Sequence, residues 1–317
     1  MTASLLTGVR LRTVAPVAAA LILGGLFGNT AAAQEDAEYS RKGADTCLSC
    51  HEDDLTLAVF RSRHAIPSDP DGPFGHGQLQ CEACHGPGDA HSGRVRRGQE
   101  RPPSISFRRD DPTPIEVQNG MCLQCHAEDT GFGWHAGAHP VDEVSCASCH
   151  TSHAAEDPVL FANTQPEVCV DCHTETRTEI RKAFAHPLAE GKMGCTDCHN
   201  AHGDEAATGF AALTPLDTCQ TCHAETRGPH LWEHAPATED CGLCHAPHGS
   251  NHPGMLTKRA PLLCQSCHTQ DGHPSVAFDS GDLVSGVASQ YLLGQSCLNC
   301  HSQVHGSNHP SGSALMR

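Results

Sequence analysis

All twenty cysteines of this 317-residue chain fall into ten Cys-x-x-Cys-His motifs, and none is left over. This pattern is typical of c-type haem attachment. Two thiols bond to the vinyl groups of one haem, and the adjacent histidine gives the iron a neutral imidazole. The sequence therefore predicts ten covalently attached haem c groups. The motif residues are Cys47, Cys50 and His51; Cys81, Cys84 and His85; Cys122, Cys125 and His126; Cys146, Cys149 and His150; Cys169, Cys172 and His173; Cys195, Cys198 and His199; Cys219, Cys222 and His223; Cys241, Cys244 and His245; Cys264, Cys267 and His268; Cys297, Cys300 and His301.

Two other uses of paired cysteines do not explain the histidines. Structural zinc sites also use CxxC pairs, and small exported domains use cysteines as a disulfide framework. Neither chemistry requires a histidine directly after every second cysteine. The chain has 25 histidines in 317 residues, so ten such placements by chance have a probability on the order of 10^-11.

The amino-terminal residues resemble a secretory signal peptide. Arg10 and Arg12 form a basic start, an apolar stretch follows, and small residues at Ala31 to Ala33 suit a cleavage site. A retained membrane anchor is the alternative, although the apolar stretch is short for a span. Because covalent haem attachment takes place outside the bacterial cytoplasm, we expect an exported protein. The expected regions are a signal peptide at 1–33 and a decahaem cytochrome domain at 34–317.

The composition leaves little material for a side-chain core. Cleavage would leave 317 − 33 = 284 residues, about 28 for each haem, and aromatic residues make up only 4% of the chain. The haems themselves must then form the interior. We predict a multihaem cytochrome c fold of mostly loops and short α-helices, with little or no sheet. The clearest helix is predicted at Thr174–Ala185, where Ile180 and Phe184 share a face.

The charge of the chain restricts its partners. The formal net charge is −17, and removing the two signal-peptide arginines makes it −19. This balance excludes nucleic acid as a partner, because nucleic-acid binding requires a basic face. It favours redox partners that carry positive patches.

The motifs repeat at nearly constant intervals. From Cys122 to Cys264, successive motifs begin 22 to 26 residues apart. The sequence after Cys169 recurs after Cys219, and that after Cys195 recurs after Cys241. The chain is therefore divided into five two-haem units, which favours an elongated row of haems in which each unit contacts its neighbours. A globular cluster of haems is the alternative.

Each iron needs a second axial ligand. Fifteen histidines lie outside the motifs but only four methionines follow the signal peptide, so bis-histidine ligation and low potentials are expected. The first five candidates follow the second motif of a unit: His91, His153, His202, His248 and His305. The other five lie between the two motifs of a unit: His64, His139, His186, His234 and His273. Two further histidines in Gly-Ser-Asn-His-Pro segments, His252 and His309, are alternatives to His248 and His305.

One stretch differs from the rest of the chain. Residues 94–111 contain six arginines: Arg94, Arg96, Arg97, Arg101, Arg108 and Arg109. These side chains form either a docking loop for a partner or anionic lipid, or a solvated loop paired with propionates and acidic residues.

At the level of whole segments, the chain resembles the MtrA/DmsE family of decahaem c-type cytochromes. The resemblance covers essentially the whole mature chain, from the Gly-Ala-Asp-Thr that precedes Cys47 to Pro310. The segments that carry it are Cys81-Glu-Ala-Cys-His-Gly-Pro-Gly, Cys146-Ala-Ser-Cys-His-Thr-Ser-His, Cys241-Gly-Leu-Cys-His-Ala-Pro-His-Gly-Ser-Asn-His and Cys297-Leu-Asn-Cys-His-Ser-Gln-Val-His-Gly.

The resemblance implies an elongated row of bis-histidine haems that conducts electrons between the periplasm and the cell exterior, for respiration on an external acceptor or donor. The implied partners are an outer-membrane β-barrel protein, periplasmic electron-carrier cytochromes, and an outer-surface multihaem cytochrome or reductase. The implied location is the periplasm, in association with the outer membrane. The resemblance also supports the ten distal histidines, most clearly His64, His91, His139, His186 and His248.

Two other functions stay open from the sequence. The chain could be a soluble periplasmic electron shuttle that needs no barrel. It could also be a multihaem reductase, which requires one iron with an open position beside acid–base groups. All ten motifs end in the ordinary histidine and distal histidines are in surplus, so we expect an electron-transfer protein with no catalytic residues.

Overall fold

The computed structural model describes residues 37–109, 113–129, 134, 137–141, 143–203, 209–268 and 297–316. The chain divides into an amino-terminal segment, Met1–Ala37, and a compact unit, Glu38–Arg317. The expected signal peptide, the candidate ligand His273 and residues 110–111 of the arginine-rich stretch lie outside the described residues.

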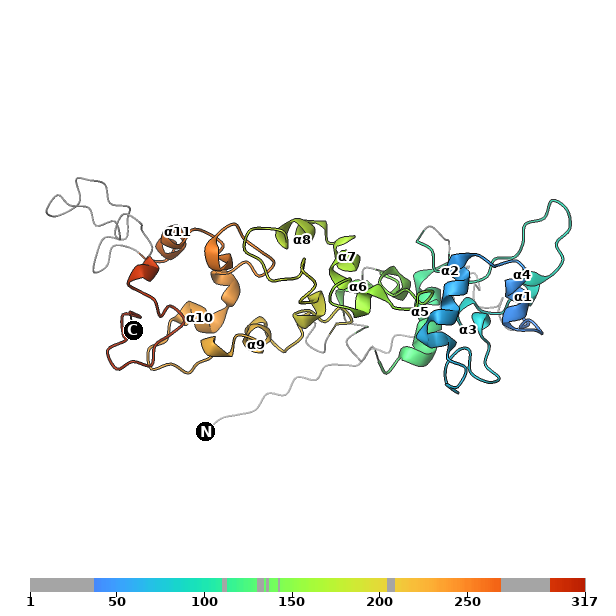
Figure 1. Ribbon diagram of the computed structural model, residues 1–317, viewed down its shortest axis with the longest axis horizontal. Helices are drawn as coiled ribbons and strands as arrows, with labels where there is room; N and C mark the ends of the chain where they lie inside the picture. The colour runs from blue at the N-terminus through green and yellow to red at the C-terminus, as the bar shows by residue number, and fades with distance from the viewer. Residues whose placement is uncertain are drawn as a thin grey trace, which may run out of the picture. The chain divides into compact units, whose positions relative to one another are not determined.

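Short helices joined by loops make up the compact unit (Figure 1). The α-helices are α1 (Ala44–Leu48), α2 (Asp54–Leu57), α3 (Cys81–His85), α4 (Asp89–Ser92), α5 (Ile115–His126), α6 (Ala138–Val141), α7 (Gln165–Val170), α8 (Thr174–Glu179), α9 (Pro215–Gln220), α10 (Ala235–Glu239) and α11 (Ala260–Gln265). The 3₁₀ turns are η1 (Ala58–Arg61), η2 (Arg63–Ala65), η4 (Cys146–Ser148), η5 (Pro158–Leu160), η6 (Cys195–Asp197), η7 (Ala224–Thr226), η8 (Cys241–Leu243), η9 (Pro253–Met255) and η10 (Cys297–Asn299).

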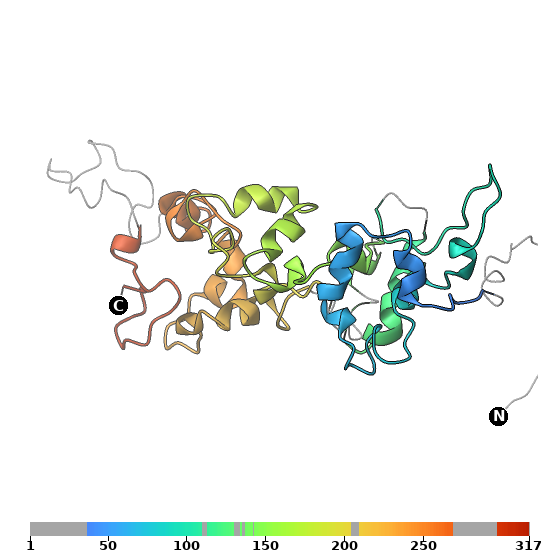
Figure 2. The same ribbon diagram turned by 45° about the vertical axis from the view of Figure 1, so that its right-hand side comes forward.

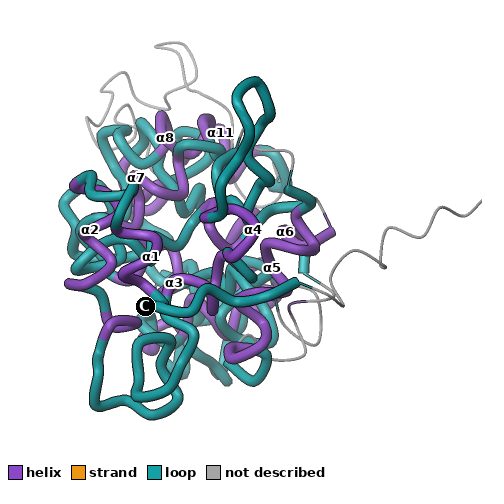
Figure 3. Tube along the Cα trace, turned by 90° about the vertical axis from the view of Figure 1, so that its right-hand side faces the viewer, coloured by secondary structure: helices purple, strands orange, loops and turns teal. Residues whose placement is uncertain are grey.

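The part of the chain that the structure describes contains no strand, only four isolated β-bridges (Figure 3). The predicted fold class of short helices and loops is therefore confirmed. None of the described helices is long and apolar enough to cross a membrane.

The two motifs of a unit differ in local structure. The first motif of every unit begins within an α-helix or at its end, in α1, α5, α7, α9 and α11. From the second unit onward, the second motif begins a single 3₁₀ turn instead, in η4, η6, η8 and η10. In each unit the helix and the turn are in contact, and in the first unit α1 contacts α3. The two-haem unit predicted from the spacing is thus also a structural unit.

Amide side chains, of which Asn119 and Gln165 are buried, join the two motifs of the first three units. Asn119 Oδ1 in α5 accepts a hydrogen bond from the backbone N–H of Cys146 at 2.8 Å. Gln165 Oε1 in α7 accepts one from Thr196 N at 3.0 Å. Gln80 Oε1 accepts one from Ala44 N at 2.6 Å. Because a buried amide needs partners for its polar atoms, these contacts hold each pair of motifs in one register.

The predicted helix at Thr174–Ala185 is only half as long as expected. Helix α8 ends at Glu179, and the chain turns through a hydrogen bond from Lys182 N to Glu179 O. Ile180 is buried, but Phe184 leaves the helix and forms an antiparallel bridge with Ser250. The bridge overrides the helical periodicity because it satisfies two backbone groups of a distant segment.

This bridge recurs in the next unit. Phe184 and Ser250 exchange hydrogen bonds of 2.9 and 2.7 Å, and Trp232 and Ser307 exchange two of 2.8 Å. Each bridge joins the position two residues before one candidate ligand to the position two residues after another. The first bridge brackets His186 and His248, and the second brackets His234 and His305.

The side-chain core is small. Among the described residues, the buried apolar side chains are Ala44, Ala58, Val59, Trp134, Val170 and Ile180. Larger apolar side chains lie at the surface of the polypeptide, with Leu213 80% and Leu55 67% exposed. A unit of this size cannot fold stably on so few buried residues. This agrees with the expectation that the polypeptide is built around its cofactors.

Within the compact unit, the helices follow one another in chain order. Helices α1 to α5 lie together, α7 and α8 come next, and α9 to α11 follow (Figures 1 and 2). A contact between α3 and α5 joins the first unit to the second.

Candidate functional site

Each motif folds into one helical turn. The backbone N–H of the motif histidine donates to the carbonyl of the first cysteine, at 3.0 Å for His51 and Cys47 and at 2.8 Å for His268 and Cys264. The same bond recurs in the 3₁₀ turns, at 2.9 Å for His150 and Cys146. One turn of helix places residues i, i+3 and i+4 on one face. The two thiols and the imidazole of a motif therefore point the same way.

Nine of the ten motif histidines face a second histidine. The ring centroids lie 6.0 to 6.2 Å apart in all nine pairs. In each pair, the histidine that lies outside a motif is one of the ten predicted distal residues. The pairs, with the motif histidine first, are His51–His91, His85–His153, His126–His64, His150–His202, His173–His139, His199–His248, His223–His186, His245–His305 and His268–His234.

This separation is the one that a single metal ion between two imidazoles requires. A metal–imidazole nitrogen bond is about 2 Å long and the nitrogen lies about 1 Å from the ring centre, so two opposed rings have centroids about 6 Å apart. Direct packing of rings has no reason to repeat one distance nine times, since aromatic contacts range over about 4.5–7 Å. The paired histidines therefore fit an iron with two axial imidazoles.

The tenth pair is not complete within the described residues. His301 donates from Nδ1 to Ala314 O at 2.6 Å. The tenth predicted distal residue, His273, lies outside the described residues, so its role as a ligand stays a prediction.

The pairing interlocks neighbouring units, which the sequence did not reveal. The third motif takes His64 of the first unit, and the fifth takes His139 of the second. The second motif takes His153 of the following unit, and the fourth takes His202. The seventh and ninth motifs likewise take a histidine of the preceding unit, and the sixth and eighth motifs take one of the following unit. The first motif instead uses His91 of its own unit, as an end of the series must.

Most of these imidazoles are oriented through Nδ1. Nine donate from Nδ1 to a backbone carbonyl: His85, His91, His139, His153, His186, His199, His234, His245 and His301. A ring that donates from Nδ1 keeps Nε2 unprotonated, and this is the tautomer that binds a metal ion. Three of these bonds repeat by position: His139 to Ala201 O, His186 to Pro247 O and His234 to Val304 O. Each acceptor directly precedes another paired histidine.

Four other imidazoles bond a carboxylate through Nδ1. His150 and Asp157 are 2.7 Å apart, and the Asp157 side chain is only 15% exposed. His126 bonds Asp129 at 2.7 Å, and the acid is 73% exposed. The other two bonds, both 3.1 Å long, join His223 to Glu225 and His248 to Glu179. A carboxylate acceptor raises the basicity of a metal-binding imidazole.

Burial keeps several paired histidines neutral. It lowers the pKa of His85, against the raising effect of the hydrogen bond that His85 donates to Ile105 O. It also lowers the pKa values of His64, His202 and His305, and in each case the facing histidine of the pair lowers the pKa further. A neutral imidazole is the form that can coordinate iron.

The thiols show how consecutive motifs adjoin. Within a unit, the first cysteines of the two motifs are neighbours: burial and, after it, the nearby thiol of Cys47 together raise the pKa of Cys81 to about 11. A hydrogen bond with Cys146 raises the pKa of Cys122. The five such pairs are Cys47–Cys81, Cys122–Cys146, Cys169–Cys195, Cys219–Cys241 and Cys264–Cys297.

Between units, the second cysteines of the motifs adjoin instead. Burial is the main cause that raises the pKa of Cys84, and the nearby thiol of Cys125 adds to it. The four such pairs are Cys84–Cys125, Cys149–Cys172, Cys198–Cys222 and Cys244–Cys267. The two kinds of contact alternate along the chain. The ten motifs therefore adjoin one another in sequence order, from the first to the tenth.

The two alternative histidines lie outside the pairs. His252 N donates to Ser250 Oγ and His309 N to Ser307 Oγ, at 3.0 and 3.2 Å. His309 Nδ1 accepts a hydrogen bond from Ser311 N. The positions they would have taken are occupied by His248 and His305, which face motif histidines.

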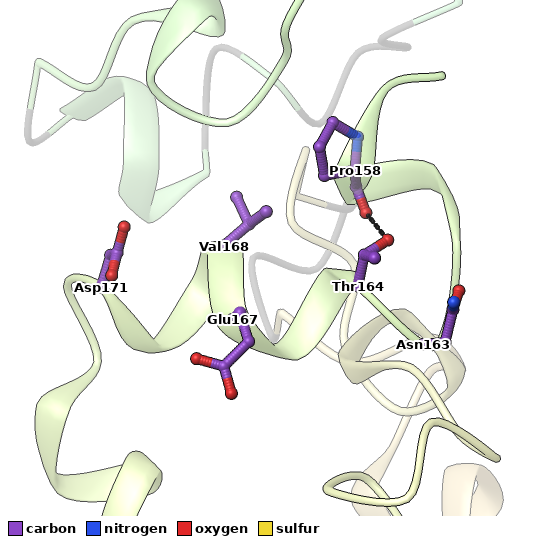
Figure 4. A pocket seen from close by; sticks show the side chains of 6 residues that line it. All are labelled: Pro158, Asn163, Thr164, Glu167, Val168 and Asp171. Atoms are coloured by element: carbon purple, nitrogen blue, oxygen red, sulfur yellow. Dashed lines mark hydrogen bonds between the residues drawn. The ribbon is translucent and has the colours of Figure 1, made fainter. Parts of the chain in front are cut away.

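A hollow of about 370 Å³ beside α7 offers no acid–base pair (Figure 4). Its two acidic side chains are already ion-paired, Glu167 with Arg181 at 3.1 Å and Asp171 with Arg177 at 3.0 Å. Thr164 Oγ1 donates to Pro158 O at 2.7 Å.

Zinc would need three or four ligands around one ion, and no group of three His, Cys, Asp or Glu side chains suited to a metal ion occurs among the described residues.

Two family models match parts of the chain. The doubled CXXCH motif model matches residues 186–228 and 234–273, and the cytochrome c-type protein NrfB-like model matches residues 81–165. Both matches fall on the repeated motifs. Each match of the doubled-motif model contains the second motif of one unit and the first motif of the next, so it supports the repeat but not the boundaries of the two-haem units.

Similar proteins are multihaem cytochromes. The chain is 46% identical over 285 residues to the multiheme cytochrome MtrA of Shewanella baltica, covering 89% of this chain and 84% of that protein. It is 29% identical over 167 residues to the cytochrome c-type protein NrfB of Escherichia coli, covering 49% of this chain and 81% of that protein. The C-type polyheme cytochrome OmcB of Geobacter sulfurreducens is 26% identical over 212 residues, covering 55% of this chain and 28% of that protein.

Proposed function

Because this chain belongs to the MtrA family of multihaem c-type cytochromes, we propose that it conducts electrons across the bacterial outer membrane. It is an electron-transfer protein whose cofactor is haem c, bound at ten CxxCH motifs. Bound haem supplies reversible one-electron chemistry at iron. The polypeptide sets the spacing, ligation and potential of each centre.

The single observation that carries the proposal is the series of histidine pairs. Nine pairs share one separation of 6.0 to 6.2 Å, and the motifs to which they belong adjoin in sequence order. We assign the twenty cysteines as attachment sites, the ten motif histidines as proximal ligands and their partners as distal ligands. His273 is assigned to His301 by elimination, because each is the one member of its set that is left over. With both axial positions of each iron taken by imidazole, electrons would pass in series from one centre to the next.

A series of ten centres has the reach that a membrane crossing needs. A bilayer with its headgroups is about 40–45 Å thick. Lipid cannot solvate loop backbone or propionates, so a chain of this kind needs an insulating sleeve. We therefore propose an outer-membrane β-barrel protein as its partner. Periplasmic electron-carrier cytochromes would lie at one end, and an outer-surface multihaem cytochrome or reductase at the other. The protein would be exported to the periplasm and held at the outer membrane.

We further propose that the protein has no catalytic site of its own. A reductase would need one iron with an exchangeable position. Every motif histidine that can be assessed already faces a second imidazole, and the acids of the hollow beside α7 are paired with arginines. A ferric EPR spectrum with only low-spin signals is expected, and a high-spin signal near one-tenth of the haem would contradict this assignment.

Fractionation tests the membrane proposal. Intact cells are treated by osmotic shock, and the decahaem protein is followed by haem stain beside a soluble periplasmic marker. Retention in the outer-membrane fraction supports the conduit, and release together with the marker supports the shuttle instead.

Electron transfer through the purified complex is the second test. The complex extracted from outer membranes is inserted into liposomes that contain oxidised methyl viologen, and dithionite is added outside. Reduction of the enclosed dye at a rate far above that of protein-free liposomes supports the conduit. Reduction at the protein-free rate would refute it.

A further inference from the structure

The loop that follows α4 is hydrogen-bonded to His91, the histidine that faces the first motif. Arg101 donates from its guanidinium to the carbonyls of His91 and Gly93. His91 Nδ1 in turn donates to Pro102 O at 2.7 Å. The ring of His91 faces that of His51, with the two centroids 6.2 Å apart. We call residues 93–101 the arginine loop. The loop projects from the part of the molecule that holds α1 and α4 (Figure 1).

The arginine loop carries concentrated positive charge. Its residues, 93–101, are all exposed and contain four arginines and one glutamate, which is a net charge of +3 in a chain of −17. A hydrogen bond from Gln99 N to Arg96 O closes the tip as a turn. Among the described residues, Arg94, Arg96 and Arg97 form no ion pair.

Two arginines of the third unit are paired with acidic neighbours. Arg177 bonds Asp171 at 3.0 Å and Arg181 bonds Glu167 at 3.1 Å. Three arginines without an ion pair within four positions therefore concentrate positive charge at the arginine loop.

We propose that the arginine loop is the docking site for a soluble electron-carrier protein that presents carboxylates around its redox centre. This proposal rests on the electron-transfer function proposed above. The first motif is one of the two ends of the series, where electrons must enter or leave. The attachment through Arg101 and His91 places a partner held by the loop directly at that end. Charge complementarity raises the rate of encounter more than it raises affinity, which suits an exchange partner.

A membrane surface suits the loop less well. Peripheral membrane segments combine basic residues with large apolar side chains that insert between lipids. Within 93–101 the only large apolar side chain is Val95. The loop has the charge for an anionic surface but not the apolar residues for insertion. We therefore favour the acidic protein, and vesicle binding becomes an outcome of the test.

The test uses the haem-loaded protein and flavodoxin hydroquinone, an acidic one-electron donor protein, in stopped flow. For the triple variant R94E/R96E/R97E we expect the second-order rate constant to fall at least tenfold at about 10 mM salt, where the Debye length is about 30 Å. The difference should shrink as salt rises. The milder variant R94Q/R96Q/R97Q should give an intermediate rate, which separates a charge effect from a folding defect.

The matched control is R177E/R181E, which reverses exposed arginines on and beside α8 in the middle of the series. Its rate should stay within about twofold of the parent, because these two arginines belong to the third unit and neither contacts the first motif's pair of histidines. An unchanged rate and salt dependence for the triple variant would overturn the proposal. So would an equal fall in the control. Loss of binding to phosphatidylglycerol vesicles without a change in the flavodoxin rate would also overturn it, in favour of a membrane site.

The outcome can be separated from that of the conduit proposal. Methyl viologen radical is a small cation and does not need an acidic docking face. If the triple variant reacts with the radical at no less than the parent rate and carries ten haems, the series of centres is intact. A slow flavodoxin rate then reports on docking alone.

Discussion

Asp157 Oδ2 lies 2.7 Å from Nδ1 of His150, and its Oδ1 accepts hydrogen bonds from the backbone N–H groups of Thr151 and Val159. The carboxylate is therefore held by the chain in the orientation that the imidazole needs. Of the four carboxylates bonded to paired histidines, that of Asp157 is the least exposed. Water therefore screens the hydrogen bond between Asp157 and His150 less than it screens the other three.

Replacing this carboxylate should raise one reduction potential. In D157N the neutral amide can keep the backbone contacts but makes His150 a weaker electron donor. We expect the reduction equilibrium of one centre in ten to shift about tenfold toward the reduced form, or about 59 mV for one electron. Spectropotentiometric titration would measure this shift. The control is E225Q, where the acid is 69% exposed and the bond is 3.1 Å. Equal shifts in both variants would contradict the role given to burial.

Gly249 should be intolerant of a side chain. Its φ is +147°, and an added Cβ would collide with the carbonyl of Glu179, whose carboxylate bonds His248. We expect G249A to lower the free energy of unfolding by about 3 kcal/mol, because strain and displacement of backbone combine. The control is G254A at φ +69°, where no atom lies within 4 Å of an added Cβ. Denaturant titration should show a loss of about 1 kcal/mol there. A similar loss of stability in both variants would show that the close contact with Glu179 does not add to the effect of a side chain at position 249.

Removing one distal histidine should open one iron. His202 faces His150 at 6.0 Å, so H202A should convert one centre in ten from low-spin to high-spin while leaving ten haems attached. Ferric EPR measures the spin state, and mass spectrometry counts the haems. H252A removes a histidine outside the pairs and should leave the spectrum unchanged. A wholly low-spin spectrum for H202A would show that His202 is not a ligand.

The last motif offers a check on the one ligand that is assigned by elimination. His273 is the remaining predicted distal residue, and His301 is already oriented through Ala314. We expect H273A to produce one high-spin centre, and H309A to produce none. A high-spin centre in H309A, with none in H273A, would reassign the final ligand.

Preparation without haem should leave the chain unfolded. Few apolar side chains are buried among the described residues, and Val170 is the only large one below 2% exposure. Circular dichroism of protein made without haem attachment should show little helix and no cooperative thermal transition. A cooperative transition in the haem-free chain would show that the side chains form a sufficient core.

The local chemistry was readable in the sequence. The motifs identify the haem attachment sites, because two thiols and an imidazole at this spacing share one helical face. Counting histidines against methionines selected bis-histidine ligation, and the repeat selected the set to which all nine observed partners belong. The predicted length of α8 was wrong. Phe184 pairs with Ser250, which lies 66 positions further along the chain, and the local periodicity does not indicate this pairing.

The assignment of each histidine to its motif came only from the tertiary structure. Nothing in the neighbourhood of His64 indicates that it faces His126 rather than His51 or His85, since all three are in ordinary motifs. The attachment of the arginine loop to His91 and the contact of Asp157 with His150 were equally hidden. Sequence determines which side chains can bind a haem, because that depends on residues within one turn. Which two turns face each other depends on how distant segments pack, and only the folded chain decides that.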